Sequence, residues 1–348
     1  MIHPPSSSYP WMSNHHNNSH HTTSFPSSSS SSSSFSSSTC PVSSSSGVTQ
    51  KIIRDRDGFQ HFLIHMLRRS GIRDRYLRTL FSSSHDCIGV YQMAFTHSSI
   101  HPLQNYEYFE ILGDATCNKS IVWYIQERFP FLQNPEGVKV IARLRINLVS
   151  KKHFSSLADS LGFLPFISCE KEIMEQREKS ILEDVFEAFF GATELLLDRI
   201  FGLGVGYFIC YRLIKSILDE KEISLRYEDL FDPITRLKET FDYFRSSSHR
   251  RFCPYVWGSM MWEAVKKKNG MQMASLFQVD QKACRKELLS TATAPFLDEA
   301  KQLAATSFLQ FLREKGFHRP VRDYYEQLLL LLHSHPPRKN KTKEEICY

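Results

Sequence analysis

Two short segments of the chain each carry a pair of carboxylates at helical spacing. Glu110 and Asp114 are four residues apart, and Asp184 and Glu187 are three apart, so each pair lies on one face if its segment is a helix. Most of the neighbouring residues are apolar, and no Lys or Arg occurs between residues 105 and 118. Carboxylates in apolar surroundings need a basic partner, a proton or a cation.

A hard divalent cation is the partner that would give these acids a chemical function. Mg²⁺ binds carboxylate oxygens and water, and phosphodiester hydrolysis uses such ions to activate water and to polarise the phosphate. Acidic pairs are also common on ordinary solvated helix faces, so spacing alone leaves both interpretations open. Glu183, beside the second pair, is expected to point away into solvent.

The elements that would position these acids are predicted to be helices. Apolar residues recur at helical spacing soon after the first charged residue, Lys51, at Phe59, Phe62, Leu63, Met66 and Leu67. Helical patterns then continue to about residue 228, without the alternation typical of strands. We therefore expect an all-α domain over 52–228.

A smaller second unit is predicted to follow. Asp232 and Pro233 suit the cap and first turn of a helix, strand-like residues come next, and a last helix begins near Phe296. The expected order is α-β-β-β-α over 230–316. Residues 317–348 are expected to add one helix and a basic tail, so the chain as a whole is mainly α.

Composition bounds the class of protein. Residues 1–50 contain no charged side chain and are rich in Ser and His, which predicts a disordered tail. The net charge of +6 is compatible with a polyanionic partner. The eight cysteines form no C-x-x-C pair, which disfavours a disulfide scaffold or zinc ribbon. With no visible signal peptide and no long apolar run, an intracellular protein is expected, cytoplasmic or nuclear, without a membrane partner.

Several motifs in order resemble the ribonuclease III family. Residues 105–114 read N-Y-E-Y-F-E-I-L-G-D, similar to the family's signature helix N-x-x-x-x-E-F-L-G-D. Before it, 94–99 read A-F-T-H-S-S, and after it 143–150 and 184–192 match the family's later helices. Order and spacing agree over roughly 58–225.

This resemblance implies a site and a function. The family's four essential metal-site acids fall on Glu110, Asp114, Asp184 and Glu187, with Mg²⁺ as cofactor and Mn²⁺ as a substitute. Glu107 and Glu136 match two accessory acids that line the cleft and contact RNA or assist the site. Ile111 stands where most relatives carry an aromatic residue that inserts into the partner subunit of a homodimer, so this dimer contact is altered.

The second unit resembles a double-stranded RNA-binding domain, with departures. Its last helix has Leu297 and Asp298 where that domain usually has paired lysines. Because phosphate contacts supply much of the affinity for duplex RNA, we expect this unit to bind RNA poorly or to serve protein contacts. Arg250, Arg251 and 266–268 offer basic residues on another face.

The leading prediction is an endoribonuclease specific for double-stranded RNA. The resemblance implies that each site of a homodimer cuts one strand and leaves 5′-phosphate ends with a short 3′ overhang. Two alternatives differ in class: a catalytically inactive RNA-binding or ribosomal processing scaffold, and a suppressor of host small-RNA silencing. A scaffold has no need of the four acids, all of which are present here.

Overall fold

A computed structural model describes residues 56–82, 86–246, 253–281 and 284–334. The predicted disordered tail over 1–50, the basic tail near the C-terminus, and Arg250 and Arg251 lie outside the described residues.

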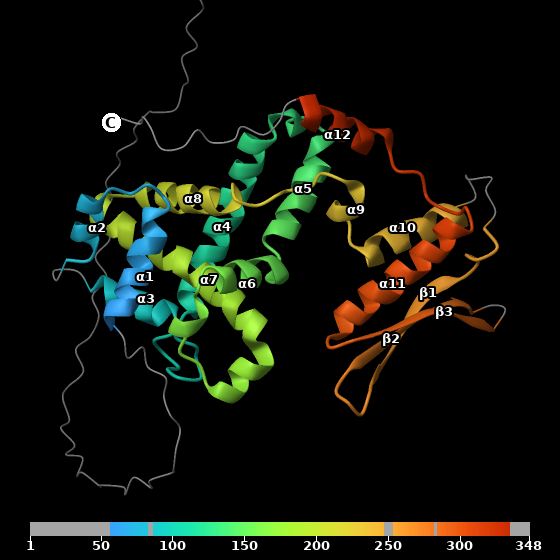
Figure 1. Cartoon of the computed structure of the whole chain (residues 1–348), viewed down its shortest axis with the longest axis horizontal. Helices are drawn as coiled ribbons and strands as arrows, with labels where there is room; N and C mark the ends of the chain where they lie inside the picture. The colour runs from blue at the N-terminus through green and yellow to red at the C-terminus, as the bar shows by residue number, and fades with distance from the viewer. Residues whose placement is uncertain (1–55, 83–85, 247–252, 282–283, 335–348) are drawn as a thin grey trace, which may run out of the picture. The chain divides into compact units, whose positions relative to one another are not determined.

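The first part of the chain is helical throughout its described length, as predicted (Figure 1). Within the described residues of this part, the one β-type pairing is an isolated parallel bridge between Thr96 and Ser168. The helices are α1 (Arg56–Arg68), α2 (Asp74–Leu80), α3 (Cys87–Ala94), α4 (Glu107–Arg128), α5 (Gly137–Leu148), α6 (Lys151–Ser160), α7 (Lys171–Phe201), α8 (Val205–Leu218) and α9 (Tyr227–Leu230), with 3₁₀ turns at Pro130–Leu132 and Leu164–Phe166.

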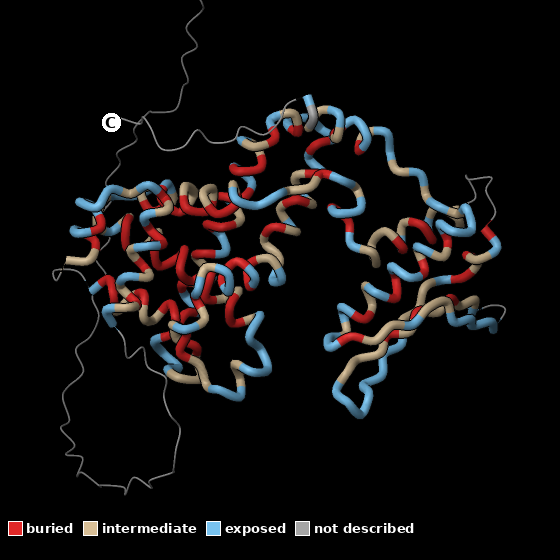
Figure 2. Tube along the Cα trace, in the orientation of Figure 1, coloured by how far each residue is buried: buried red, intermediate tan, exposed pale blue. Residues whose placement is uncertain are grey.

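Helix α7 is the central element of this part. Every residue from Val185 to Thr193 is buried, including Phe186, Phe189 and Phe190 (Figure 2). A helix that is apolar on all sides must be surrounded by others, and each fully buried Phe contributes about 1.5–3 kcal/mol. The face of α1 predicted from its spacing joins the same core, through Phe59, Leu63, Met66 and Leu67.

The second part confirms the predicted order α-β-β-β-α. Helix α10 (Pro233–Arg245) is followed by strands β1 (Ser259–Lys266), β2 (Gln272–Asp280) and β3 (Arg285–Ala294) and by helix α11 (Leu297–Glu314). The strands form an antiparallel sheet in the order β1-β2-β3, with a register shift at Leu276. Asp232 caps α10, because its carboxylate accepts a hydrogen bond from the Thr235 N–H at 3.0 Å.

One face of this sheet is covered by the two helices (Figure 1). Leu276 of β2 packs with Leu237 and Phe241 of α10 and with Phe308 and Leu312 of α11. The alternation of buried and less buried residues along β2 follows from this one-sided cover.

The helix expected within residues 317–348 is α12 (Asp323–Ser334). Its Tyr325 and Leu328 are buried in the core cluster of the first part. The Tyr325 ring lies 5.3 Å from that of Tyr227 and 5.9 Å from that of Phe231, centroid to centroid. In the part of the chain that is described, no helix combines the length and apolarity needed to span a membrane.

Candidate active site

The two acidic helices cross at unusually short distance, because each has a glycine at the contact. A Cβ added to Gly113 of α4 would lie 1.8 Å from the carbonyl oxygen of Glu187, and one added to Gly191 of α7 would lie 2.0 Å from that of Phe109. Only glycine permits this approach of two backbones. The crossing brings the Glu110–Asp114 turn of α4 beside the Asp184–Glu187 turn of α7.

The four acids consequently act on one another. Burial, and then the charges of Asp184, Glu107, Glu183 and Asp114, raise the pKa of Glu110 to about 7. Burial, and then Asp114, Glu183, Glu110 and Asp184, raise the pKa of Glu187 to about 8. Each of the four predicted acids therefore contributes to one local field of negative charge.

Asp184 is held by a hydroxyl from the other helix. The buried Tyr106, which immediately precedes α4, donates a hydrogen bond from its hydroxyl to Asp184 Oδ2 at 2.9 Å. Burial raises the pKa of Asp184, while this hydrogen bond and the charges of Lys151 and Arg177 oppose the rise. The carboxylate is thus oriented before any ligand binds.

Asp114 lies on the exposed side of the crossing. Its Oδ1 accepts a hydrogen bond from Asn118 Nδ2 at 2.6 Å, and Asn118 Oδ1 in turn accepts one from Arg145 at 2.7 Å. The guanidinium thus reaches Asp114 through an amide, which orients the acid without neutralising it directly.

Glu183 corrects one expectation. It is not solvated: only 17% of its side chain is exposed, and its carboxylate forms an ion pair with Lys151 at 3.3 Å. The same Lys151 ammonium donates to Ser180 Oγ at 3.1 Å. A basic partner therefore reaches the acidic crossing from α6, more than thirty residues away in sequence, where helix spacing on α7 could not reveal it.

The donor set fits a divalent cation, although the side chains do not yet converge. Among the described residues, no group of three or more acidic, His or Cys side chains is gathered closely enough to hold a metal ion. Within the same described part, the Glu110 and Glu187 carboxylates accept no hydrogen bond and form no ion pair. Buried charge without a partner is what a cation would stabilise, and binding would require these side chains to rotate toward it.

The accessory acids are both exposed but differ in position. Glu107 lies in the first turn of α4 and adds its charge to the field on Glu110. Glu136 precedes α5 and is not among the carboxylates that raise the pKa of Glu110 or Glu187. Ile111, on the outer side of α4, is 75% exposed.

The basic run Lys266–Lys268 of the second part lies at its β1–β2 turn. Lys266, Lys267 and Lys268 are exposed there, and Lys267 donates to Thr293 Oγ1 at 3.1 Å. Helix α11 begins at Leu297 and has Asp298 and Glu299 in its first turn. An acidic first turn suits the helix dipole and repels phosphate.

Removing the Tyr106 hydroxyl is expected to loosen Asp184. The Tyr106→Phe variant should lose about 1 kcal/mol of stability and need several times more Mg²⁺ for half of the metal-induced rise in melting temperature, since the carboxylate is no longer oriented. Tyr91→Phe is the matched control, because the buried Tyr91 hydroxyl bonds Thr193 at 3.0 Å. Equal Mg²⁺ requirements in both variants would contradict a role for Tyr106 at the site.

Comparison with known proteins gives a consistent set of similarities. Residues 107–197 match the model of the ribonuclease III domain. A protein provisionally named ribonuclease 3 from Invertebrate iridescent virus 6 is 33% identical over 265 residues, which cover 73% of this chain and 87% of that protein. One of the same provisional name from Frog virus 3 is 40% identical over 183 residues, covering 52% of this chain but 48% of that protein. The nuclease domain of ribonuclease III from Campylobacter jejuni aligns over 47% of this chain and 97% of that domain, with 24% identity and a TM-score of 0.35.

Proposed function

Because the chain belongs to the ribonuclease III family, we propose that it is an endoribonuclease that hydrolyses double-stranded RNA with the aid of Mg²⁺ or Mn²⁺. The observation that carries this proposal is the crossing of α4 and α7 at Gly113 and Gly191. It sets four acids in one field, two of which have no partner among the described residues.

Glu110, Asp114, Asp184 and Glu187 are the residues that would hold the metal. A divalent ion bound there supplies a Lewis acid and an activated water for attack on phosphorus. The chain itself contributes orientation, because Tyr106 holds Asp184 and Asn118 holds Asp114. The buried Glu187 side chain would turn toward the ion. Lys151 and Arg145 limit the negative charge that approaching RNA phosphates would otherwise meet.

Incubation of the full chain with long duplex RNA tests the proposal. Cleavage is expected with Mg²⁺ and absent with chelator, and the products should carry 5′-phosphate ends and short 3′ overhangs. Single-stranded RNA of the same sequence is the control substrate. If no duplex is cut with either Mg²⁺ or Mn²⁺, the nuclease proposal is wrong and the scaffold alternative is favoured.

Stability should depend on both pH and metal. Folding raises the pKa of Glu187 to about 8 and of Glu110 to about 7, above the ordinary value of 4.5. The folded state then keeps protons that the unfolded state has released, so metal-free stability should fall as pH rises from about 4.5 to about 8. Millimolar Mn²⁺ should raise the melting temperature more at pH 8 than at pH 5.

The Asp114→Asn variant tests whether the charges of the four acids cause this dependence on pH and Mn²⁺. With one fewer charge in the field, it should raise metal-free stability at pH 8 and weaken the Mn²⁺ effect. Asp159→Asn, at an exposed position on α6, should change neither. A wild-type melting temperature that changes neither with pH in this range nor with Mn²⁺ would contradict the metal assignment.

We expect the chain to act as a homodimer through the outer side of α4. Ile111→Asp should place a charge in the contact and shift a dimer toward monomer in sedimentation at micromolar protein. Leu203→Asp is the matched control, since Leu203 is 95% exposed and lies after α7. A wild type that is strictly monomeric while cutting duplex RNA would contradict the dimer.

The second part is expected to add little phosphate affinity, because α11 opens with acidic residues.

The described cysteines, among them Cys87, Cys117 and Cys210, are all free. Free thiols suit the cytoplasmic or nuclear location that we propose for the enzyme.

A further inference from the structure

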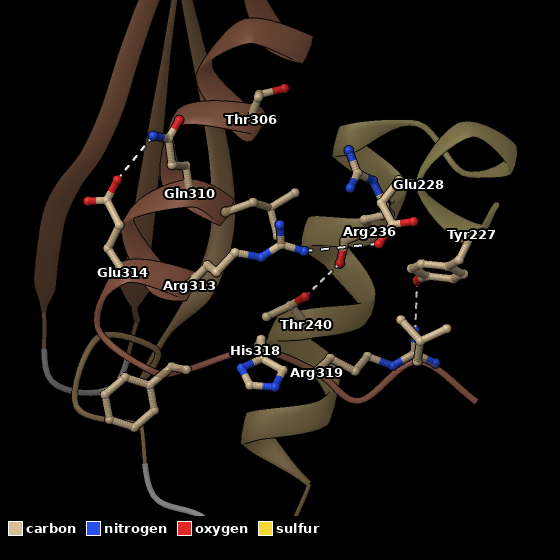
Figure 3. A pocket seen from close by; sticks show the side chains of 13 residues that line it. Tyr227, Glu228, Arg236, Thr240, Thr306, Gln310, Arg313, Glu314, His318 and Arg319 are labelled. Atoms are coloured by element: carbon tan, nitrogen blue, oxygen red, sulfur yellow. Dashed lines mark hydrogen bonds and ion pairs between the residues drawn. The ribbon is translucent and has the colours of Figure 1, made fainter. Parts of the chain in front are cut away.

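A groove away from the four acids lies between helices α10 and α11 (Figure 3). It encloses about 480 Å³, within the range of small-molecule sites. Its walls come from α10, from the C-terminal half of α11, from Tyr227 and Glu228 of α9, and from the segment 317–321 that follows α11. The chain entering the second part and the chain leaving it therefore both border the groove.

Three guanidinium groups line this groove, and they differ in how many hydrogen-bond and ion-pair partners they have. Arg319 is already paired, since its Nη1 donates to the Tyr227 hydroxyl at 2.8 Å and to the Glu239 carboxylate. Within the described residues, the one partner of the Arg313 guanidinium is Glu228, in a long ion pair of 4.0 Å across the groove (Figure 3). Arg236 has a buried Nε without an acceptor in the described part of the chain.

Among the described residues that line the groove, Arg236 is the one with a buried polar side-chain atom that lacks a partner. A charged donor that is buried without an acceptor destabilises the structure. The nearby carboxylates do not meet this need: Glu314 accepts a hydrogen bond from Gln310 at 3.0 Å, and Glu228 faces Arg313. An oxyanion between Arg236 and Arg313 would supply the acceptors.

The rest of the lining is apolar or aromatic. Leu309, Phe317 and Val321 line the groove beside the charged residues. A bare inorganic anion would leave this surface uncovered, whereas a planar organic group attached to the anion would bury it. Guanidinium groups also suit phosphate geometry, because they donate in pairs.

We propose that this groove binds a phosphate monoester of nucleotide size, with the phosphate between Arg236 and Arg313. The chemistry is shared by a free nucleoside 5′-monophosphate and by the 5′-phosphorylated end of an RNA strand. None of the four acids takes part, so the site is independent of the proposed nuclease. A ligand held there would lie beside Tyr227, before α10, and beside Phe317, after α11.

Calorimetric titration of the full chain, without divalent metal, tests the proposal. The probes are adenosine 5′-monophosphate, adenosine, inorganic phosphate, and a short single-stranded RNA with or without a 5′-phosphate. The monophosphate should bind at least tenfold more tightly than adenosine or inorganic phosphate. Arg236→Gln and Arg313→Gln should each weaken its binding tenfold or more. Arg245→Gln, exposed on the same helix, should leave it within twofold.

The RNA arms identify the source of the phosphate. Adenosine 5′-monophosphate that binds more tightly than the 5′-phosphorylated RNA supports a free nucleotide, whereas RNA that needs its 5′-phosphate and binds more tightly than the mononucleotide supports a strand end. Binding of adenosine as tight as that of its monophosphate, equal losses in Arg236→Gln and Arg245→Gln, or no saturable binding of any probe would overturn the proposal. Arg313, which is exposed, keeps the test decisive if Arg236→Gln fails to fold. The assay measures no cleavage, so its failure would leave the proposed nuclease untouched.

Discussion

Replacing Glu187 by Gln is expected to reduce duplex RNA cleavage a thousandfold or more, on the order of 4 kcal/mol in activation free energy. Glu187 is 7% exposed, and burial with the neighbouring charges raises its pKa to about 8, compared with about 7 for Glu110. Its amide analogue keeps the shape of the side chain but removes a full negative charge from the metal site. Single-turnover cleavage with saturating Mg²⁺ separates this loss of chemistry from a loss of RNA binding.

The same substitution should leave the fold intact and make it more stable without metal. A neutral amide no longer opposes Asp114 and Glu110 in a half-buried field, so the fall in stability toward pH 8 should be smaller. Glu194→Gln is the matched control, two turns further along α7, where the carboxylate accepts a hydrogen bond from Thr116. If Glu187→Gln cuts as fast as Glu194→Gln, the four-acid assignment is wrong.

Gly191→Ala is expected to lower the free energy of unfolding by more than about 3 kcal/mol, as severe overpacking does. The added Cβ would lie 2.0 Å from the Phe109 carbonyl oxygen, and backbone cannot yield as a flexible side chain does. Gly113→Ala should act similarly, with its Cβ 1.8 Å from the Glu187 carbonyl oxygen. Any protein that still folds must separate α4 from α7, which should also lower cleavage. Equilibrium unfolding in denaturant measures the first effect.

Gly162→Ala separates crowding from backbone conformation. Gly162 has φ +80° and no atom within 4 Å of an added Cβ, so alanine there meets only the cost of a left-handed residue, about 1–2 kcal/mol. If Gly191→Ala lowers the free energy of unfolding no more than Gly162→Ala does, α4 and α7 can separate without cost. The crossing would then not be what sets the distance between the acidic pairs.

Local pattern was sufficient to predict much of this protein. The spacing of apolar residues identified the buried face of α1, and Asp232 with Pro233 marked the start of α10, because caps and helix faces depend on residues close in sequence. The order α-β-β-β-α followed from the same kind of signal. Motif order identified the family and, through it, the four candidate acids.

Tertiary structure alone decided how those acids are partnered. The sequence shows two acidic pairs some seventy residues apart, each on its own helix, and by itself it leaves open whether they meet. The close crossing at Gly113 and Gly191, the hydroxyl of Tyr106 on Asp184 and the ammonium of Lys151 on Glu183 all arise between elements distant along the chain. Glu183 was misplaced for this reason, because helical spacing describes one helix and contains nothing about the helix packed against it. The groove between α10 and α11 has the same origin, since its guanidinium groups come from two helices and a loop that only the fold brings together.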